Sequence, residues 1–378
     1  MLSYGFRPFF LLAGFYAGAS ILFWLPILHG ELAAATAFAP LDWHVHEMLF
    51  GYVAAVVTGF LLTAIPNWTG RLPIQGAPLL LLVGVWLLGR IAVTVSAWIG
   101  WAPAAIVDSA FLVLVAAAAA REIIAGRNWR NLRVLAIIAI LAAANICFHL
   151  EAHSAGVADY AARAGIAAIV LLIVLVGGRV VPSFTHNWLA RAGSGRLPAP
   201  FGRLDIAAMV VSAAALALWT ALPPAPATAA ALLLAGILQT ARLARWAGDR
   251  TYREPLVLIL HVAYAFVPLG FFLTAAGALG LIAASAGIHA WAVGAIGAMT
   301  LAIMTRASLG HTGRPLTASP VTQAIYLAIV VAALARIGAA LLPSWNDPLL
   351  QLAAFAWAAA FLGFGLGYLP ILCTARRT

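Results

Sequence analysis

Histidines gather where a very apolar segment begins, in the stretch WHVHEMLFGY at residues 43–52. His44, His46 and Glu47 all carry side chains that bind metals or move protons. A regular helix turns about 100° per residue, which places His44 and Glu47 on one face and His46 about 200° away from His44. One metal ion could not take both histidines from such a helix. We therefore expect them to have separate roles, unless the helix begins later than residue 44.

Histidines at the ends of other apolar segments extend this candidate metal site. His149 and His289 are predicted at the same membrane face as His44 and His46, so we expect these four to be metal ligands near the outer face. Neutral imidazole suits iron, copper and zinc. A single histidine at a helix end is more often an interfacial anchor. That interpretation fits two others better, namely His29 and His153.

Several residues have a second interpretation beside a role in chemistry. His261 and His311 are predicted toward the opposite face, where they would bind a second metal or form part of an electron-entry site, although His311 also fits a hydrogen-bonded turn in GHTGRP. Glu47 would orient a metal-bound imidazole or supply a proton as the catalytic acid, yet pairing with a nearby arginine is almost as good an explanation. Arg90 and Asp108 lie at similar depth in consecutive segments and are expected to form an ion pair.

The composition decides what kind of protein must position these side chains. Of the 378 residues 65% are hydrophobic and only 8% are charged, whereas a soluble domain is about half apolar and a quarter charged. The net charge of +10 comes from arginine alone, and the arginines do not form one basic domain, which argues against nucleic acid as a partner. The two cysteines, Cys147 and Cys373, are too far apart for a CxxC metal site or a disulfide framework.

The pattern of apolar segments predicts an all-α integral membrane protein. A helix needs about 20 apolar residues to cross the bilayer core. That length predicts one polytopic bundle of about twelve helices, with residues 1–378 as a single transmembrane domain and the first helix retained rather than cleaved as a signal. The predicted spans are 8–29, 44–66, 78–98, 103–120, 133–152, 160–182, 204–222, 226–247, 255–276, 288–305, 321–342 and 349–372.

The arginines predict the orientation of this bundle. The connections at 30–43, 99–102, 153–159, 223–225 and 277–287 contain no arginine. Cytoplasmic connections carry the excess of basic residues, so both termini are predicted to be cytoplasmic. The alternate connections and the helix ends beside them hold Arg71, Arg121, Arg127, Arg130, Arg133, Arg191, Arg196, Arg203, Arg242, Arg245, Arg250, Arg253, Arg306 and Arg314.

Six segments together resemble the NnrS family of haem- and copper-containing multi-span membrane proteins linked to nitric oxide. They run from residue 4 to residue 315, so the last two spans contribute little. The segments are YGFRPFFLLAG, WHVHEMLFGY, GFLLTAIPNWTGR, GGRVVPSFTHNW, HVAYAFVPLG and GAIGAMTLAIMTRASLGHTGRP.

The resemblance implies a protein of the bacterial inner membrane that binds haem b and copper. It further implies a role in nitric oxide metabolism, denitrification or protection from nitrosative stress, with an unidentified electron donor. Two arginines of the matching segments, Arg179 and Arg306, are expected to bind the cofactor. The family's motif histidines fall on His44, His46, His149, His261, His289 and His311.

Two functions from different classes remain open at this point. The first is a haem–copper site that binds nitric oxide. If the protein is an enzyme, this function would make it an oxidoreductase. The second is a transporter that carries a metal ion, haem or a small solute with protons, since polar residues and glycines inside twelve spans are also transporter features. No pair of broken helices at matching positions is evident, which favours the first function.

Overall fold

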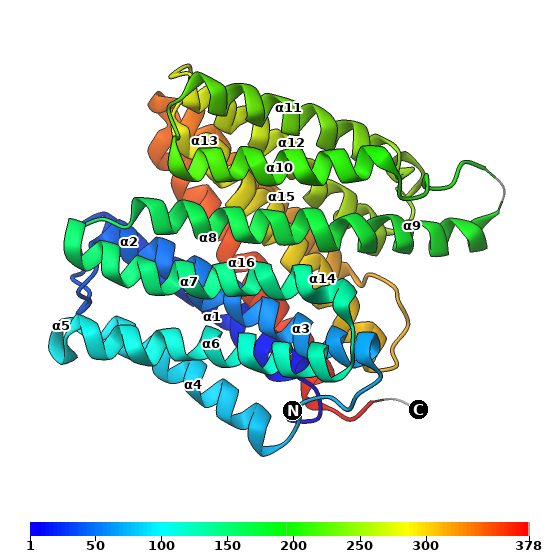
Figure 1. The fold of residues 1–378 in the computed structure, drawn as a ribbon, viewed down its shortest axis with the longest axis horizontal. Helices are drawn as coiled ribbons and strands as arrows, with labels where there is room; N and C mark the ends of the chain where they lie inside the picture. The colour runs from blue at the N-terminus through cyan, green and yellow to red at the C-terminus, as the bar shows by residue number, and fades with distance from the viewer. Residues whose placement is uncertain (194, 377–378) are drawn as a thin grey trace. The chain divides into compact units, whose positions relative to one another are not determined.

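The computed structural model describes residues 1–193 and 195–376, and within them it is built from helices without a strand (Figure 1). The α-helices are α1 (Phe6–Leu28), α2 (Pro40–His46), α3 (Ala54–Thr69), α4 (Ala77–Thr94), α5 (Ser96–Ile99), α6 (Trp101–Ala125), α7 (Leu132–Ala155), α8 (Asp159–Leu172), α9 (Gly178–Ala192), α10 (Arg203–Ala221), α11 (Pro226–Ala244), α12 (Pro255–Ala278), α13 (Ala284–His289), α14 (Ala298–His311), α15 (Pro320–Leu341) and α16 (Asn346–Cys373). Short 3₁₀ turns are η2 (Trp129–Asn131), η4 (Gly248–Arg250) and η6 (Pro343–Trp345), and π-helical segments are η1 (Glu47–Val53), η3 (Ile173–Gly177) and η5 (Ala290–Gly297).

Twelve helices of the described residues are long and apolar enough to cross a membrane, which confirms the predicted number of spans. The chain is therefore a multi-pass membrane protein. The ends of the spans differ from the predicted ones. The second span begins at Pro40 rather than at 44, because proline fits the first turn of a helix, and it ends at Thr69 before Gly70, whose φ of 70° suits glycine. His44 and His46 thus lie inside a helix.

Three spans contain a π-helical segment, and these spans are the second, the sixth and the tenth. A π-helical segment widens the turn and frees a backbone carbonyl, and such segments are frequent at functional sites. In η1 the carbonyl of Gly51 accepts a hydrogen bond from Trp86 Nε1 at 2.9 Å. In η3 the carbonyl of Val174 accepts one from Arg242 Nη1 at 2.9 Å. These two carbonyls therefore accept hydrogen bonds from side chains of neighbouring helices.

The second and tenth spans also share a sequence pattern. His46 ends α2 and His289 ends α13, and each is followed directly by a π-helical segment. A glycine occurs five residues after each histidine, and the triplet Thr-Gly-Arg begins 23 residues after it, at Thr69 and at Thr312. The two spans therefore share the spacing of a histidine, a glycine and a Thr-Gly-Arg triplet.

The structured chain divides into two units. The first unit comprises residues 1–168, 307–314 and 361–378, and α1 with α3, α4 with α6, and α6 with α7 pack against each other in it. Glycines allow close approach here, since a Cβ on Gly59 would lie 2.8 Å from the ring of Phe10. Arg7 is buried and donates to the carbonyls of Leu372 and Thr374 at 2.7 and 2.6 Å, which joins the two ends of the described chain.

The second unit comprises residues 169–306 and 315–360, and α10, α11 and α12 pack in sequence within it. A fully buried guanidinium organises its polar interior. Arg242 donates to Asp205 Oδ1 at 2.9 Å and to the hydroxyl of Tyr264 at 3.0 Å, while that hydroxyl donates to Gln239 at 2.8 Å. A buried arginine needs such partners, and here each of them is present.

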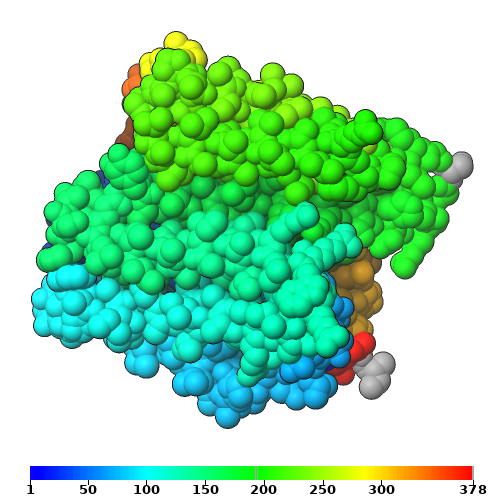
Figure 2. Space-filling model, viewed as in Figure 1, coloured from blue at the N-terminus to red at the C-terminus, as the bar shows by residue number. Residues whose placement is uncertain are grey.

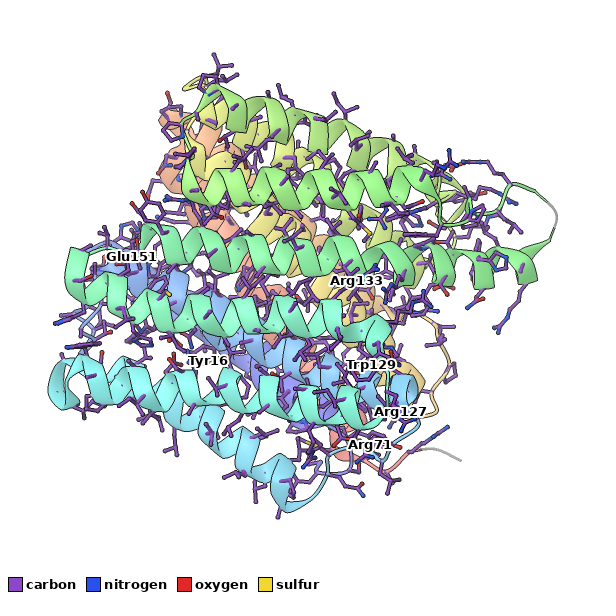
Figure 3. The ribbon with its side chains drawn as sticks, viewed as in Figure 1. Tyr16, Arg71, Arg127, Trp129, Arg133 and Glu151 are labelled. Atoms are coloured by element: carbon purple, nitrogen blue, oxygen red, sulfur yellow. The ribbon has the colours of Figure 1, made fainter. Side chains whose placement is uncertain are left out.

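Three arginines of the first unit lie at the same end of it, as the alternation of arginines between the connections predicts (Figure 3). Figure 3 shows Arg71, Arg127 and Arg133 at one end of this unit and Glu151 at the opposite end. Glu151 accepts backbone hydrogen bonds from Tyr160 and Ala161 at the start of α8, at 2.9 and 2.8 Å. The basic end is the predicted cytoplasmic end, and the orientation itself stays a prediction.

Candidate metal centre

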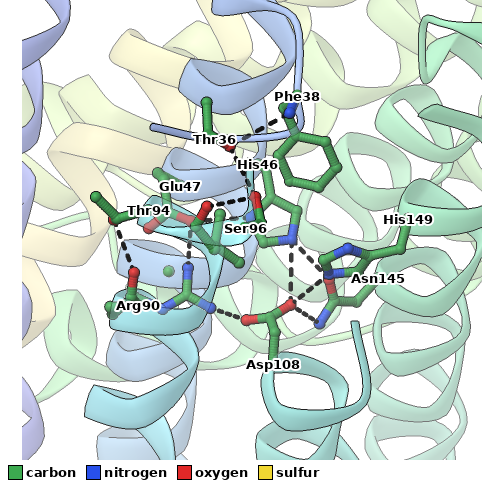
Figure 4. A network of polar contacts seen from close by, with 12 residues as sticks. Thr36, Phe38, His46, Glu47, Arg90, Thr94, Ser96, Asp108, Asn145 and His149 are labelled. Carbon is green, nitrogen blue, oxygen red and sulfur yellow. Dashed lines mark hydrogen bonds and ion pairs between the residues drawn. The ribbon is translucent and has the colours of Figure 1, made fainter. Parts of the chain in front are cut away.

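A buried cluster of two histidines and one aspartate lies in the first unit. His46 Nε2 is 3.2 Å from Asp108 Oδ2, and His149 Nε2 is 2.9 Å from the same oxygen (Figure 4). One donor atom from each residue lies within 4.8 Å of the others, and these three residues make up the cluster of potential metal ligands found in the described residues. We call His46, Asp108 and His149 the triad.

The triad joins three helices that are far apart in sequence. His46 ends α2, Asp108 lies in α6 and His149 lies in α7. Asn145 is one helical turn before His149, so its side chain lies on the same face. Its Nδ2 donates to Asp108 Oδ2 at 2.9 Å, while its Oδ1 is 3.0 Å from His46 Nε2. The amide thus fixes the distance between the carboxylate and the first imidazole.

Glu47 and Arg90 form the other side of the cluster. Glu47 Oε1 is 3.0 Å from His46 Nδ1 and accepts a hydrogen bond from Arg90 Nη1 at 2.7 Å. Arg90 Nη2 donates to Asp108 Oδ1, so the ion pair predicted for these two residues is present. Glu47 Oε2 accepts from the phenol of Tyr16. The carboxylate therefore contacts His46 and an arginine at once, and both roles considered for it occur together.

The charges of this cluster do not cancel. With both carboxylates ionised, Glu47 and Asp108 contribute −2 and Arg90 contributes +1, which leaves −1. All of these side chains are buried, and His46 is 0% exposed. An uncompensated charge inside a membrane protein is costly. A cation at the triad, either a proton on an imidazole or a metal ion, would balance it.

The donor set fits a single metal ion. Metal–nitrogen and metal–oxygen bonds are about 2.0–2.2 Å long, so two ligands of a tetrahedral ion are about 3.3 Å apart. The observed 3.2 and 2.9 Å are within a few tenths of an ångström of that separation. A metal-bound histidine normally gives its other N–H to a carboxylate, and His46 has Glu47 in that place. Two imidazoles and one carboxylate suit copper, iron or zinc.

Aromatic rings enclose the two imidazoles. Phe50 and Phe148 each lie 5.2 Å from the ring of His46, and both are buried. The ring of Phe38 lies 5.0 Å from that of His46 and 5.1 Å from that of His149. Figure 2 shows side chains of α6 and α7 (cyan to blue-green) covering one face of the first unit, and the triad lies beneath the surface.

Two of the four outer histidines predicted as ligands are brought together, and two are not part of the triad. His44 points away from His46 and stacks on Trp24 with ring centroids 4.2 Å apart, so the two histidines of WHVHEMLFGY do have separate surroundings. His289 belongs to the second unit, where its Nδ1 donates to the carbonyl of Ser285 at 2.8 Å. His153 stacks on Trp101 at 4.1 Å, as suits an interfacial anchor.

The remaining predicted site residues are spread over the two units. His311 is exposed in the first unit, with its ring 5.6 Å from Phe6. In the second unit Arg179 is half-buried, and the guanidinium of Arg306 lies 4.2 Å from the ring of Phe184.

His261 is buried in the second unit. Thr185 donates its hydroxyl proton to the carbonyl of Val181, so His261 Nε2 donates to Thr185 at 2.8 Å. This leaves Nδ1 as the acceptor atom, and it has no hydrogen-bond partner among the described residues. A Cβ on Gly248 would lie 2.5 Å from Nδ1, so this turn fills the space beside it.

Sequence reasoning missed part of the cluster. Asp108 was expected to pair with Arg90 only, although a carboxylate has a second oxygen that can face a different partner. Asn145 had a signal, since it precedes His149 by four residues and must share its helix face. No feature of the sequence distinguishes Tyr16 and Phe38 from the many other aromatic residues in the chain.

The fold and the cluster together define the class. The chain is an all-helical, multi-pass membrane protein with a buried histidine–aspartate group that could hold a metal ion. The family model of the NnrS protein matches residues 1–376, so the chain belongs to the NnrS family, as the sequence motifs indicate. No curated protein matches the chain in a sequence comparison.

Proposed function

We propose that this protein binds copper at the triad and handles nitric oxide there, in nitric oxide metabolism or protection from nitrosative stress in the bacterial inner membrane. One observation carries the proposal. His46, Asp108 and His149 converge with metal-ligand spacing in a buried cluster in which Asp108, Glu47 and Arg90 together carry a net charge of −1. Copper, when bound, would supply a coordination position at which nitric oxide can bind.

Each neighbour of the triad has a distinct task in this proposal. Glu47 accepts the Nδ1 proton of His46 and so keeps Nε2 directed at the metal position. Arg90 fixes Glu47 and Asp108 relative to each other. Tyr16 holds the second oxygen of Glu47 and continues the hydrogen-bonded chain away from the triad. Glu47 is therefore a positioning residue, and it is also the group through which a proton would pass toward the centre.

The apolar surroundings suit nitric oxide as the ligand. The gas is small and uncharged, so it enters lipid readily and would reach a buried centre without a polar channel. The rings of Phe38, Phe50 and Phe148 offer it no hydrogen bond and exclude water from the imidazoles. On the side of these rings, a bound metal would be the group that holds the gas.

Haem b is proposed as a second cofactor on the family resemblance, and the described residues fit it less well than they fit copper. His261 has an acceptor nitrogen free of hydrogen bonds, but Gly248 packs directly against it. The guanidinium of Arg306 lies 4.2 Å from the ring of Phe184 and could receive a carboxylate. No step of the proposed function is assigned to haem.

Metal analysis of histidine variants tests the proposal. The protein is purified in detergent from copper-supplemented cells, and copper is measured in the wild type and in His46→Ala, His149→Ala and His153→Ala. We expect bound copper in the wild type and in His153→Ala, which lies on the same helix but faces Trp101. Loss in the first two variants would support the triad. Equal copper in all four proteins, or uptake of copper into proteoliposomes without retention, would contradict it.

A further inference from the structure

Phe38 is placed between the triad and the protein surface. Its ring lies 5.0 and 5.1 Å from the rings of His46 and His149 and 5.5 Å from that of Phe148. Of the three phenylalanines around the imidazoles, Phe50 and Phe148 are buried, whereas Phe38 is half-buried. Phe38 therefore covers both imidazoles on one side and reaches the surface on the other.

The segment that carries Phe38 is not part of a helix. Residues 30–39 connect α1 to α2 without regular structure. The backbone N–H groups of Glu31 and Leu32 donate hydrogen bonds to the carbonyl of Pro26 at 2.8 and 3.2 Å. These bonds fix the first residues of the segment to the end of α1. We call residues 30–39 the covering loop. Its position over the triad must come from contacts near Phe38 itself.

A chain of hydrogen bonds holds the covering loop in place beside the triad. The hydroxyl of Ser96 donates to the carbonyl of Val93 at 2.8 Å, so its oxygen accepts from Ala37 N at 2.8 Å and from the hydroxyl of Thr36 at 3.2 Å. The Thr36 oxygen in turn accepts from Phe38 N at 3.3 Å. Every hydroxyl in this chain has a defined direction, and the chain ends on the backbone of Phe38.

A second contact supports the same arrangement. The amide of Ala97 donates to the carbonyl of Ala35 at 3.0 Å, so two neighbouring residues at the start of α5 each bind the loop. Ser96 is buried although it carries a hydroxyl, and these bonds are what satisfies it. The covering loop is thus anchored to α5, a helix that carries none of the three triad residues.

We propose that Phe38 makes the metal centre selective for small uncharged ligands over anions and chelators. The inference rests on the proposed copper site. A hydrated anion that passes this ring must lose water without gaining a hydrogen bond, and removing water from an isolated charge is costly, whereas nitric oxide or carbon monoxide has no such shell. The ring also blocks the approach of a large charged chelator, and so it retains the metal.

Azide and a sulfonated copper(I) chelator are the probes for this inference. Copper-loaded wild type is compared with Phe38→Ala, with Ser96→Ala, which loosens the loop but keeps the ring, and with Phe23→Ala as the matched control. Phe23 is also partly exposed in the first unit, but its ring packs on Trp43 and not on the triad. Azide binding is read from the spectrum of the copper(II) protein. Copper loss is read from the absorbance of the chelator complex after the protein has been reduced with ascorbate, which supplies the electron that copper(I) requires.

We expect azide to leave the spectra of the wild type and Phe23→Ala unchanged and to alter that of Phe38→Ala. The rate of copper loss should rise about tenfold or more in Phe38→Ala and by a smaller factor in Ser96→Ala. Nitric oxide binding should persist in all four proteins. Copper-loaded wild type that binds azide, or equal rates in all variants, would overturn the inference and leave the copper site intact. A wild type without copper would overturn the proposed function and this inference with it.

Discussion

Replacing Arg90 by methionine should destabilise the protein more than any other single loss of a charge in the first unit. Arg90 is buried and donates to two buried carboxylates, at Glu47 and at Asp108. A hydrogen bond to a charged group contributes about 1.5–3 kcal/mol, and breaking a buried ion pair costs about 3–5 kcal/mol. The substitution changes the net charge of the cluster from −1 to −2. We therefore expect a loss of about 3–5 kcal/mol in the free energy of unfolding.

Arg71→Met is the matched control, because it removes the same side chain from an ion pair at the surface. The side chain of Arg71 is 46% exposed, and its partner Glu122 also has Arg121 beside it. Exposed pairs contribute about 0–1 kcal/mol, so the control should lose no more than that. Both variants are unfolded reversibly in mixed micelles, and tryptophan fluorescence reports the transition. Equal losses in the two variants would refute the argument that the buried cluster depends on Arg90.

Copper should offset part of this loss, since a bound cation replaces some of the missing positive charge. The difference in unfolding free energy between Arg90→Met and the wild type should be smaller in the copper-loaded proteins than in the metal-free ones. A difference that is unchanged by copper would mean that the metal binds away from the two carboxylates. The same titration applied to Arg71→Met should show no such effect.

Three further substitutions follow from contacts in the two units. Tyr16→Phe removes one donor from Glu47, so we expect a loss of about 1.5–3 kcal/mol in micelle unfolding and an altered copper spectrum with copper retained. Gly51→Ala should lower the free energy of unfolding by about 1–3 kcal/mol, because the new Cβ would lie 2.8 Å from a guanidinium nitrogen of Arg90. Gly84→Ala is the control: nothing lies within 4 Å of its new Cβ, so it should be neutral or stabilising. Equal effects of the two substitutions would refute this prediction. Asp205→Asn should cost about 3–5 kcal/mol, since it leaves a fully buried arginine without its carboxylate, and a loss below 1 kcal/mol would contradict the burial argument.

The sequence allowed the membrane architecture to be predicted because hydrophobic length is a local property. Twelve spans were expected, and the described residues contain twelve helices that are long and apolar enough to cross a membrane, with differences mainly at their ends. The ion pair of Arg90 and Asp108 was also predictable, since an isolated charge in a membrane needs a partner at its own depth. The separate surroundings of His44 and His46 follow from helical geometry alone.

The composition of the triad was not predictable in the same way. Asp108 contacts two histidines from two other helices, and such convergence depends on packing between segments about 40–60 residues apart in the chain. The π-helical segment after His46 shifts the register of every later residue in its span, which no periodicity reveals. Phe38 lies in a loop without a repeating pattern, so its contact with the imidazoles is visible only in three dimensions.

Anomalous diffraction from crystals of the copper-loaded protein, recorded on both sides of the copper absorption edge, would show whether copper binds at the triad. We expect a peak about 2.0–2.2 Å from His46 Nε2, His149 Nε2 and Asp108 Oδ2, with Glu47 still hydrogen-bonded to His46 Nδ1. A copper peak elsewhere in the protein, with the two imidazoles still hydrogen-bonded to Asp108 as they are here, would contradict it.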